Sequence, residues 1–163
     1  MCTLPSLPVG WAPGRPPGPR PPGGPDRLSA ALQRGIPTLL VPGCTDFIVS
    51  GPLSTTEKHF PNRRYHYHNA AIATARTDHK EAEILARALA KLCNEARGPR
   101  AIAVPLGGLS GFDRPGGPLY DPEAPKIMAE TLKKELDAQT ALHVMSPRRF
   151  RITPLTGLSG LPL

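Results

Sequence analysis

Residues 78–104 read DHKEAEILARALAKLCNEARGPRAIAV, and this stretch decides the fold. Asp78 and Glu81 have the spacing of a capping box, in which two side chains bond the free N–H groups at the start of a helix. Apolar residues then recur on one side of a helix, at Leu85, Leu89, Leu92 and Ala96. Gly98-Pro99 ends that pattern, and the apolar run 101–104 follows at once. The stretch predicts a long amphipathic helix that leads into a short strand buried on both faces.

The same alternation of strand and helix extends along the chain in both directions. Asp26 can cap a short helix that Gly35 stops, and Asp121 with Pro122 can begin a second long helix. Short runs typical of strands lie at 38–41, 65–68 and 140–144. Strands joined by helices imply parallel crossovers, so we expect a Rossmann-like three-layer α/β sandwich with a mostly parallel sheet of about four strands.

Three regions differ in composition. Of the first 25 residues 14 are Pro or Gly, so the segment 1–25 is expected to be a disordered leader. Residues 26–146 carry the strand and helix patterns and form the expected domain. Residues 147–163 follow no period of 2 or 3.6 and are expected to be an irregular basic tail.

The formal charge of +7 does not indicate nucleic-acid binding, because it lies mostly at the two ends. Residues 26–146 hold 15 Lys and Arg against 13 Asp and Glu. Three widely spaced cysteines argue against disulfides or a zinc site. The chain has neither a signal-peptide pattern nor an apolar run of about 20 residues. We therefore expect a soluble cytoplasmic protein with no membrane segment.

Three loops carry the candidate binding residues. In an open parallel sheet, ligands bind outside the carboxyl ends of the strands. The loop 42–46 follows the first strand, Asn69 and Arg76 precede the long helix, and the glycine-rich loop 107–117 follows the next strand. Glycine loops expose N–H groups to phosphate or carboxylate, but glycines also serve tight turns, and neither GxGxxG nor GxxxxGK[ST] is present. Both interpretations stay open for this loop.

Charged residues in these loops allow two interpretations each. Arg76 could clamp an anion with two hydrogen bonds, or lie on the surface paired with Asp78 or Glu81. Asp46 and Asp113 could bind a ribose hydroxyl or a magnesium ion or act as a base, or they could cap their own loops.

Two further patterns suggest other chemistry. His66 and His68 share one face of a strand, as two metal ligands can, but no third ligand is evident and no metal site is predicted. Cys44 follows a strand and could be a nucleophile, or an inert thiol without an activating base.

The ordered motifs resemble a known family, that of the ATP-binding domain of the plant tobamovirus-resistance protein and its uncharacterised bacterial and fungal relatives. The resemblance covers residues 23 to about 146 and only the second half of the family's domain. It rests on the stretches GPDRL at 24–28, VPGCTD at 41–46, HN at 68–69, RT at 76–77 and GLSGFDRPGGPLYDP at 108–122.

The resemblance implies two Rossmann-like subdomains and ATP binding, with an inhibitory protein interaction in the plant member. Carried onto this chain, it implies a set of candidate ligand-binding residues drawn from the three loops. They are Gly43, Cys44, Asp46, His68, Asn69, Arg76, Gly108, Ser110, Asp113, Gly116 and Gly117.

We therefore expect a nucleotide-binding domain half, from a truncated product, with ATP and magnesium as its ligands. Because the first subdomain is replaced by the leader, the chain alone should bind ATP weakly or not at all. One alternative is a protein-interaction module that docks a protein partner or a second copy. Another is a small hydrolase that uses Cys44 or Ser110 as its nucleophile.

Overall fold

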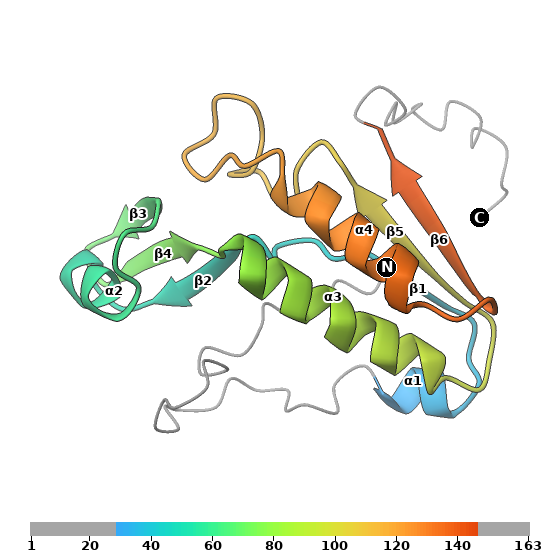
Figure 1. Cartoon of the computed structure of the whole chain (residues 1–163). Helices are drawn as coiled ribbons and strands as arrows, with labels where there is room; N and C mark the ends of the chain where they lie inside the picture. The colour runs from blue at the N-terminus through green and yellow to red at the C-terminus, as the bar shows by residue number, and fades with distance from the viewer. Residues whose placement is uncertain (1–28, 147–163) are drawn as a thin grey trace, which may run out of the picture.

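The structure, a computed structural model, describes residues 29–146. The predicted leader at 1–25, the predicted helix cap at Asp26 and the predicted tail at 147–163 lie outside the described residues. Within the described part the chain forms a mixed α/β fold with two sheets, one parallel and one antiparallel (Figure 1).

The parallel sheet has three strands in the order β1-β5-β6. These are β1 (Thr38–Leu40), β5 (Arg100–Pro105) and β6 (Thr140–Met145). Leu40 pairs with Ile102, and Ile102 pairs with Leu142, so one row of apolar side chains crosses the sheet. The three apolar runs predicted as parallel strands at 38–41, 101–104 and 140–144 are confirmed.

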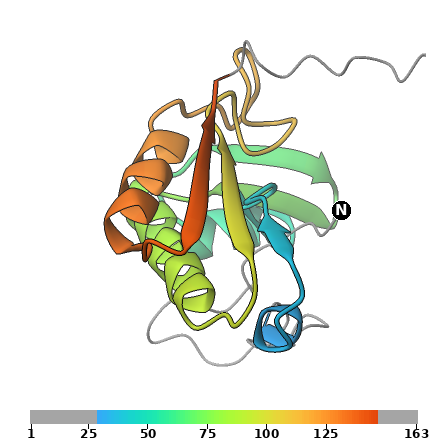
Figure 2. The same ribbon diagram turned by 90° about the vertical axis from the view of Figure 1, so that its right-hand side faces the viewer.

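Two long helices cover one face of this sheet (Figures 1 and 2). They are α3 (His79–Asn94) and α4 (Ala124–Glu135). Their apolar sides meet the row of strand side chains and exclude water, which is the main source of stability in such a fold. The buried core consists of Leu40, Leu85, Ala86, Leu89, Ala90, Cys93, Ile102, Val104, Leu109, Met128, Ala129 and Leu132.

The helix starts are determined by local side chains. The predicted capping box of α3 is confirmed, since Asp78 accepts from the N–H of Glu81 and Glu81 accepts from the N–H of Asp78. The start predicted for α4 is wrong by a few residues. Asp121 does accept a hydrogen bond from the N–H of Glu123, but the helix begins at Ala124.

The second sheet was not predicted as such. It has the order β2-β4-β3, with β2 (Phe47–Ser50), β3 (Tyr65–Asn69) and β4 (Ile72–Arg76), all antiparallel. The helix α2 (Leu53–His59) connects β2 to β3 and packs against this sheet.

The prediction of a fourth strand in the parallel sheet is wrong. Residues 65–69 do form a strand, but it pairs antiparallel with β4. Residues 70 and 71 alone separate these two strands, and such a short connection permits only a hairpin, whereas a parallel crossover needs a dozen or more residues.

The antiparallel unit is inserted between β1 and α3 in the chain and adjoins the N-terminal end of α3 (Figure 1). The loop after β1 leads into β2, and β4 leads directly into α3. The insertion therefore adjoins the carboxyl ends of the parallel strands, where the candidate residues were predicted.

The short helix α1 (Ser29–Gln33) lies near the opposite end of the sheet, and Gly35 follows it with a φ of 72°. Left-handed φ values suit glycine, as the predicted helix stop requires. None of the helices within residues 29–146 has the length and apolar character needed to cross a membrane.

Candidate functional site

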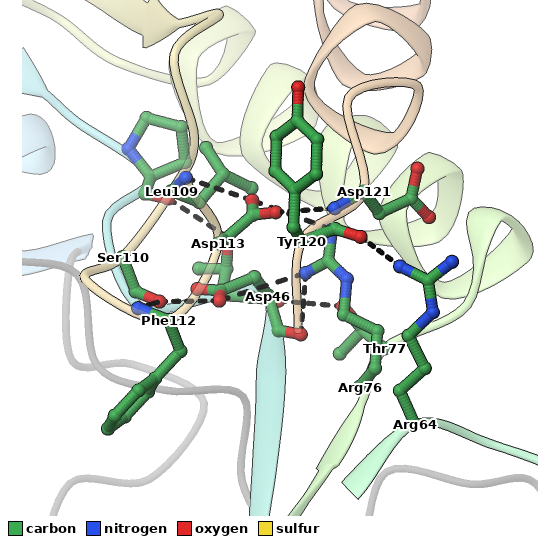
Figure 3. Close-up of polar contacts among 12 residues, drawn as sticks. Asp46, Arg64, Arg76, Thr77, Leu109, Ser110, Phe112, Asp113, Tyr120 and Asp121 are labelled. Carbon is green, nitrogen blue, oxygen red and sulfur yellow. Dashed lines mark hydrogen bonds and ion pairs between the residues drawn. The ribbon is translucent and has the colours of Figure 1, made fainter. Parts of the chain in front are cut away.

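Three charged side chains from separate parts of the chain meet beside the carboxyl ends of β1 and β5 (Figure 3). Asp46 comes from the loop after β1, Arg76 from the end of β4, and Asp113 from the loop after β5. Their exposed fractions are 0% for Asp46, 5% for Arg76 and 0% for Asp113. We call these three residues the buried cluster.

Arg76 joins the two sheets through the loop that follows β1. Its Nη1 donates a hydrogen bond of 2.6 Å to the carbonyl oxygen of Asp46. The same carbonyl accepts from the N–H of Thr77 at 3.0 Å. The guanidinium lies farther from the carboxylates, with Nη1 3.8 Å from Asp46 Oδ2 and Nη2 3.6 Å from Asp113 Oδ2.

Asp46 also bonds the loop that follows β5. The hydroxyl of Ser110 donates a hydrogen bond of 2.6 Å to Asp46 Oδ2, and Ser110 Oγ accepts one from the N–H of Phe112. Burial raises the pKa of Asp46 above its ordinary value, and the Asp113 carboxylate adds to this rise. The hydrogen bond from Ser110 and the positive charge of Arg76 only partly offset it.

Asp113 organises its own loop, which agrees with the loop-capping interpretation of this residue. Its Oδ2 accepts from the N–H of Leu109 and its Oδ1 from the N–H of Asp121. Gly108 has a φ of 120°, and a Cβ at this position would lie 1.6 Å from the carbonyl oxygen of Asp113. Only glycine fits there, because any side chain would collide with the main chain.

The loops after β1 and β5 contact each other directly. The N–H of Cys44 donates to the carbonyl oxygen of Leu109 at 2.8 Å. Cys44 is exposed and has a φ of 59°, which is uncommon for a residue with a side chain. Partial burial raises the pKa of the Cys44 thiol and the nearby Asp46 carboxylate raises it further, which favours the inert-thiol interpretation.

Neither interpretation of Arg76 from the sequence describes its surroundings. It is buried and bonded to Asp46, so it is not an open clamp for an anion, and it is not a surface partner of Asp78 or Glu81. Arg63 forms those ion pairs instead, at 3.1 Å to Asp78 and 2.6 Å to Glu81.

His68 and Asn69 lie apart from the buried cluster, on the hairpin between β3 and β4. Asn69 Oδ1 accepts from the N–H of Ala71 and so caps the turn. His68 packs against His66, whose ring centroid lies 4.3 Å from that of Phe112. Within residues 29–146 no hydrogen bond or ion pair links His68 or Asn69 to the cluster.

The remaining candidate glycines lie in turns of the loops 42–46 and 106–122. The N–H of Gly43 donates to the carbonyl oxygen of Val41, and the N–H of Gly117 donates to that of Arg114. Gly116 has a φ of 81°. No set of three or more His, Cys, Asp or Glu side chains within residues 29–146 is arranged to hold a metal ion.

Comparison with known proteins places this fold in a family. The model of the C-terminal domain of an uncharacterised protein family, UPF0261, matches residues 20–149. This chain belongs to the UPF0261 family.

Relatives of this UPF0261 chain occur in bacteria and plants. It is 33% identical over 114 residues to a UPF0261 protein of Clostridium tetani, and the aligned region covers 70% of this chain and 28% of that protein. It is 36% identical over 101 residues to one from Brucella melitensis, with 62% of this chain and 24% of that protein covered. It is 32% identical over 111 residues to the ToMV resistance protein Tm-1 of Solanum lycopersicum, and the aligned region covers 68% of this chain and 15% of that protein. The matched part of the chain therefore spans only 15–28% of the length of these relatives.

Two contacts of this UPF0261 domain were not predicted from its sequence. Arg64 Nη1 donates to the carbonyl oxygen of Tyr120, and His79 Nε2 lies 2.8 Å from Asp121 Oδ2. Burial alone would raise the pKa of Asp121, but the hydrogen bond from the N–H of Glu123 and the contact with His79 lower it overall. Both contacts tie the loop 106–122 to the rest of the domain, and no local pattern identifies partners so distant in sequence.

Proposed function

We propose that the rim formed by the loops 42–46 and 106–122 binds the phosphate part of a nucleotide-type ligand such as ATP. One observation carries the proposal. The loops that leave two neighbouring parallel strands are held in contact by the 2.8 Å hydrogen bond from Cys44 N–H to Leu109 O. In open α/β sheets, ligands bind outside this end of the strands.

The rim offers groups that attract an anion. Within residues 29–146, the N–H groups of Gly107 and Gly108 donate no hydrogen bond, so both are available to an anion. Arg64 and Arg114 are exposed on the segments that border this rim. Arg114 forms no ion pair with any residue of 29–146, so its charge is not neutralised there.

In this proposal the buried cluster is the framework that shapes the rim. Both carboxylate oxygens of Asp113 accept main-chain N–H bonds, and Arg76 is bonded to Asp46. Magnesium, which accompanies ATP in many proteins, would therefore be held through the ligand's phosphate oxygens, as is usual for this ion.

The topology supports a site that is only partly present in this chain. In Rossmann-like sheets the ligand lies where the strand order reverses. In the order β1-β5-β6 each strand lies on the same side of the one before it, and α3 and α4 cover the same face. A reversal of the strand order therefore requires a further strand on the free side of β1. The matched segment makes up 15–28% of the length of these relatives, and a further part of such a protein could supply that strand and complete a three-layer Rossmann-like sandwich. Binding by this chain should accordingly be weak, with a Kd of about 1 mM.

Unfolding in the presence of ligand tests the proposal. With a Kd of about 1 mM, 10 mM ATP or inorganic triphosphate should raise the free energy of unfolding by about 1.4 kcal/mol relative to sodium chloride of equal ionic strength. Adenosine, which has no phosphate, should have a smaller effect. Arg114→Gln should reduce the effect of triphosphate.

Arg97→Gln is the matched control. It also removes one positive charge, but Arg97 is exposed near the start of β5, whereas the rim adjoins the end of this strand. Equal loss of the triphosphate effect in both variants would mean that net charge alone attracts the anion, and the rim would not be its site.

A second candidate function, protein interaction, is favoured by exposed apolar side chains beside β1. Leu39 is 54% exposed on the sheet face opposite the core, and Ile36 is 50% exposed. Exposed apolar surface of this kind is typical of protein contacts when it forms a continuous patch.

Sedimentation at increasing protein concentration tests whether a second copy of the chain binds to this surface. An oligomer that Leu39→Ser converts to monomer would support this function, and a monomer at all concentrations with no binding of an apolar dye would argue against it.

A further inference from the structure

The buried cluster contains polar atoms with no partner. Within residues 29–146, Asp46 Oδ1, Arg76 Nε and Arg76 Nη2 form no hydrogen bond, although both side chains are at least nine-tenths buried. Buried polar atoms in proteins almost always have a hydrogen-bond partner. Arg76 Nη2 cannot use Asp113 for this purpose at 3.6 Å, which exceeds the range of a normal hydrogen bond.

The chemistry of these atoms selects the group that would satisfy them. Asp46 Oδ1 needs a donor, whereas Arg76 Nε and Nη2 need an acceptor. An anion would meet Arg76 but would be repelled by two carboxylates, and a cation would meet Asp46 but would be repelled by the guanidinium. A neutral hydroxyl both donates and accepts.

We propose that a hydroxyl group binds in the buried cluster, donating to Asp46 Oδ1 and accepting from Arg76. Ser110, which bonds Asp46, is only partly buried, and Cys44 in the same loop as Asp46 is exposed, so the position lies just beneath the rim. The hydroxyl comes either from an ordered water or from the sugar of a phosphorylated ligand. Only the sugar source rests on the proposed function; the hydroxyl position itself does not.

Crystallography of the 163-residue chain at high resolution tests the position. An oxygen within about 3.2 Å of both Asp46 Oδ1 and a free nitrogen of Arg76 is expected. An empty position in which Arg76 Nη2 has moved to hydrogen-bond distance of Asp113 would overturn the proposal, because the cluster would then satisfy itself.

The source of the hydroxyl is tested with ribose 5-phosphate and 2-deoxyribose 5-phosphate, with inorganic phosphate as reference. If the sugar is the source, a ribose hydroxyl replaces the water in soaked crystals. Removal of the responsible hydroxyl, tested with the 2-deoxy and 3-deoxy sugar phosphates in NMR titrations, then weakens binding about tenfold, which is the net worth of one hydrogen bond. Ser110→Ala serves as a control for general damage to the loop, because it removes a hydroxyl partner of Asp46 Oδ2 but none of the three unpaired atoms.

The outcomes separate this inference from the proposed function. Phosphate binding at the rim with equal affinities for ribose and deoxyribose compounds would overturn the sugar source and leave the proposed function intact. A water in the cluster with no phosphate binding would support the hydroxyl position and count against the proposed function.

Discussion

Arg76 donates a hydrogen bond of 2.6 Å to the carbonyl oxygen of Asp46, thirty residues earlier in the chain. The bond joins the last residue of β4 to the loop that leaves β1, so it is a buried contact between the antiparallel unit and the parallel sheet. Because Asp113 lies on the other side of the same guanidinium, the loop after β5 belongs to this arrangement as well.

Arg76→Met should destabilise the domain strongly. It removes the 2.6 Å hydrogen bond and leaves two buried carboxylates without a counter-charge. Loss of one partner from a buried ionic group costs about 3–5 kcal/mol, which urea unfolding would measure. Arg87→Met is the control, since the Arg87 side chain is 59% exposed in its pair with Glu83. Loss of this exposed pair should lower the free energy of unfolding by about 1 kcal/mol or less. Equal losses in the two variants would contradict the importance of the cluster.

Gly108→Ala should be more harmful than Gly111→Ala. A Cβ at position 108 would lie 1.6 Å from the Asp113 carbonyl oxygen, whereas nothing lies within 4 Å of a Cβ at position 111. We expect a loss above about 1 kcal/mol at 108 and a change within about 0.5 kcal/mol at 111, measured by thermal unfolding. Similar values at the two positions would show that the 106–122 loop adapts freely.

The free energy of unfolding of the Asp46→Asn variant, compared with that of the natural chain, should increase as the pH rises from 4 to 7. Burial raises the pKa of Asp46 in the folded state above its value in the unfolded chain, so the folded state binds the proton more tightly. The natural chain therefore loses stability as the pH rises from the unfolded pKa through the folded pKa, and the asparagine variant does not. Urea titrations at several pH values give this difference. A difference that declines with pH would mean that Arg76 and Ser110 hold the pKa of Asp46 below normal.

Cys44 should react slowly with iodoacetamide at pH 7, because partial burial and the Asp46 charge raise the pKa of its thiol. Asp46→Asn removes the charge and should increase the rate at pH 8, as followed by peptide mass spectrometry. Cys93 should be labelled only after unfolding, because burial raises its pKa to about 11 and its side chain is inaccessible. Rapid labelling of Cys44 at pH 7 would instead favour the hydrolase alternative.

Elements with strong local patterns could be predicted from the sequence. Asp78 and Glu81 cap α3 as expected, and the apolar runs of β1, β5 and β6 do form one parallel sheet. The antiparallel unit could not be assigned in the same way. Its strand β4, Ile72–Arg76, alternates small and polar residues that suit a strand or a loop equally well.

The candidate site was predicted in part. The sequence indicated Asp46, Arg76 and Asp113 as important, and they do meet. Their burial was not evident, because charged residues in loops are usually exposed. That Arg63 rather than Arg76 pairs with Asp78 depends on the hairpin register, which no short window of sequence specifies.

An amide NMR titration with ATP tests the central claim most directly. If the rim is the binding site, the shifts that change will be confined to residues 43–46 and 107–117, and triphosphate will reproduce them while adenosine will not. Shifts centred elsewhere, for example on the exposed face around Leu39, or no shifts at 10 mM ATP, about ten times the expected Kd, would contradict it.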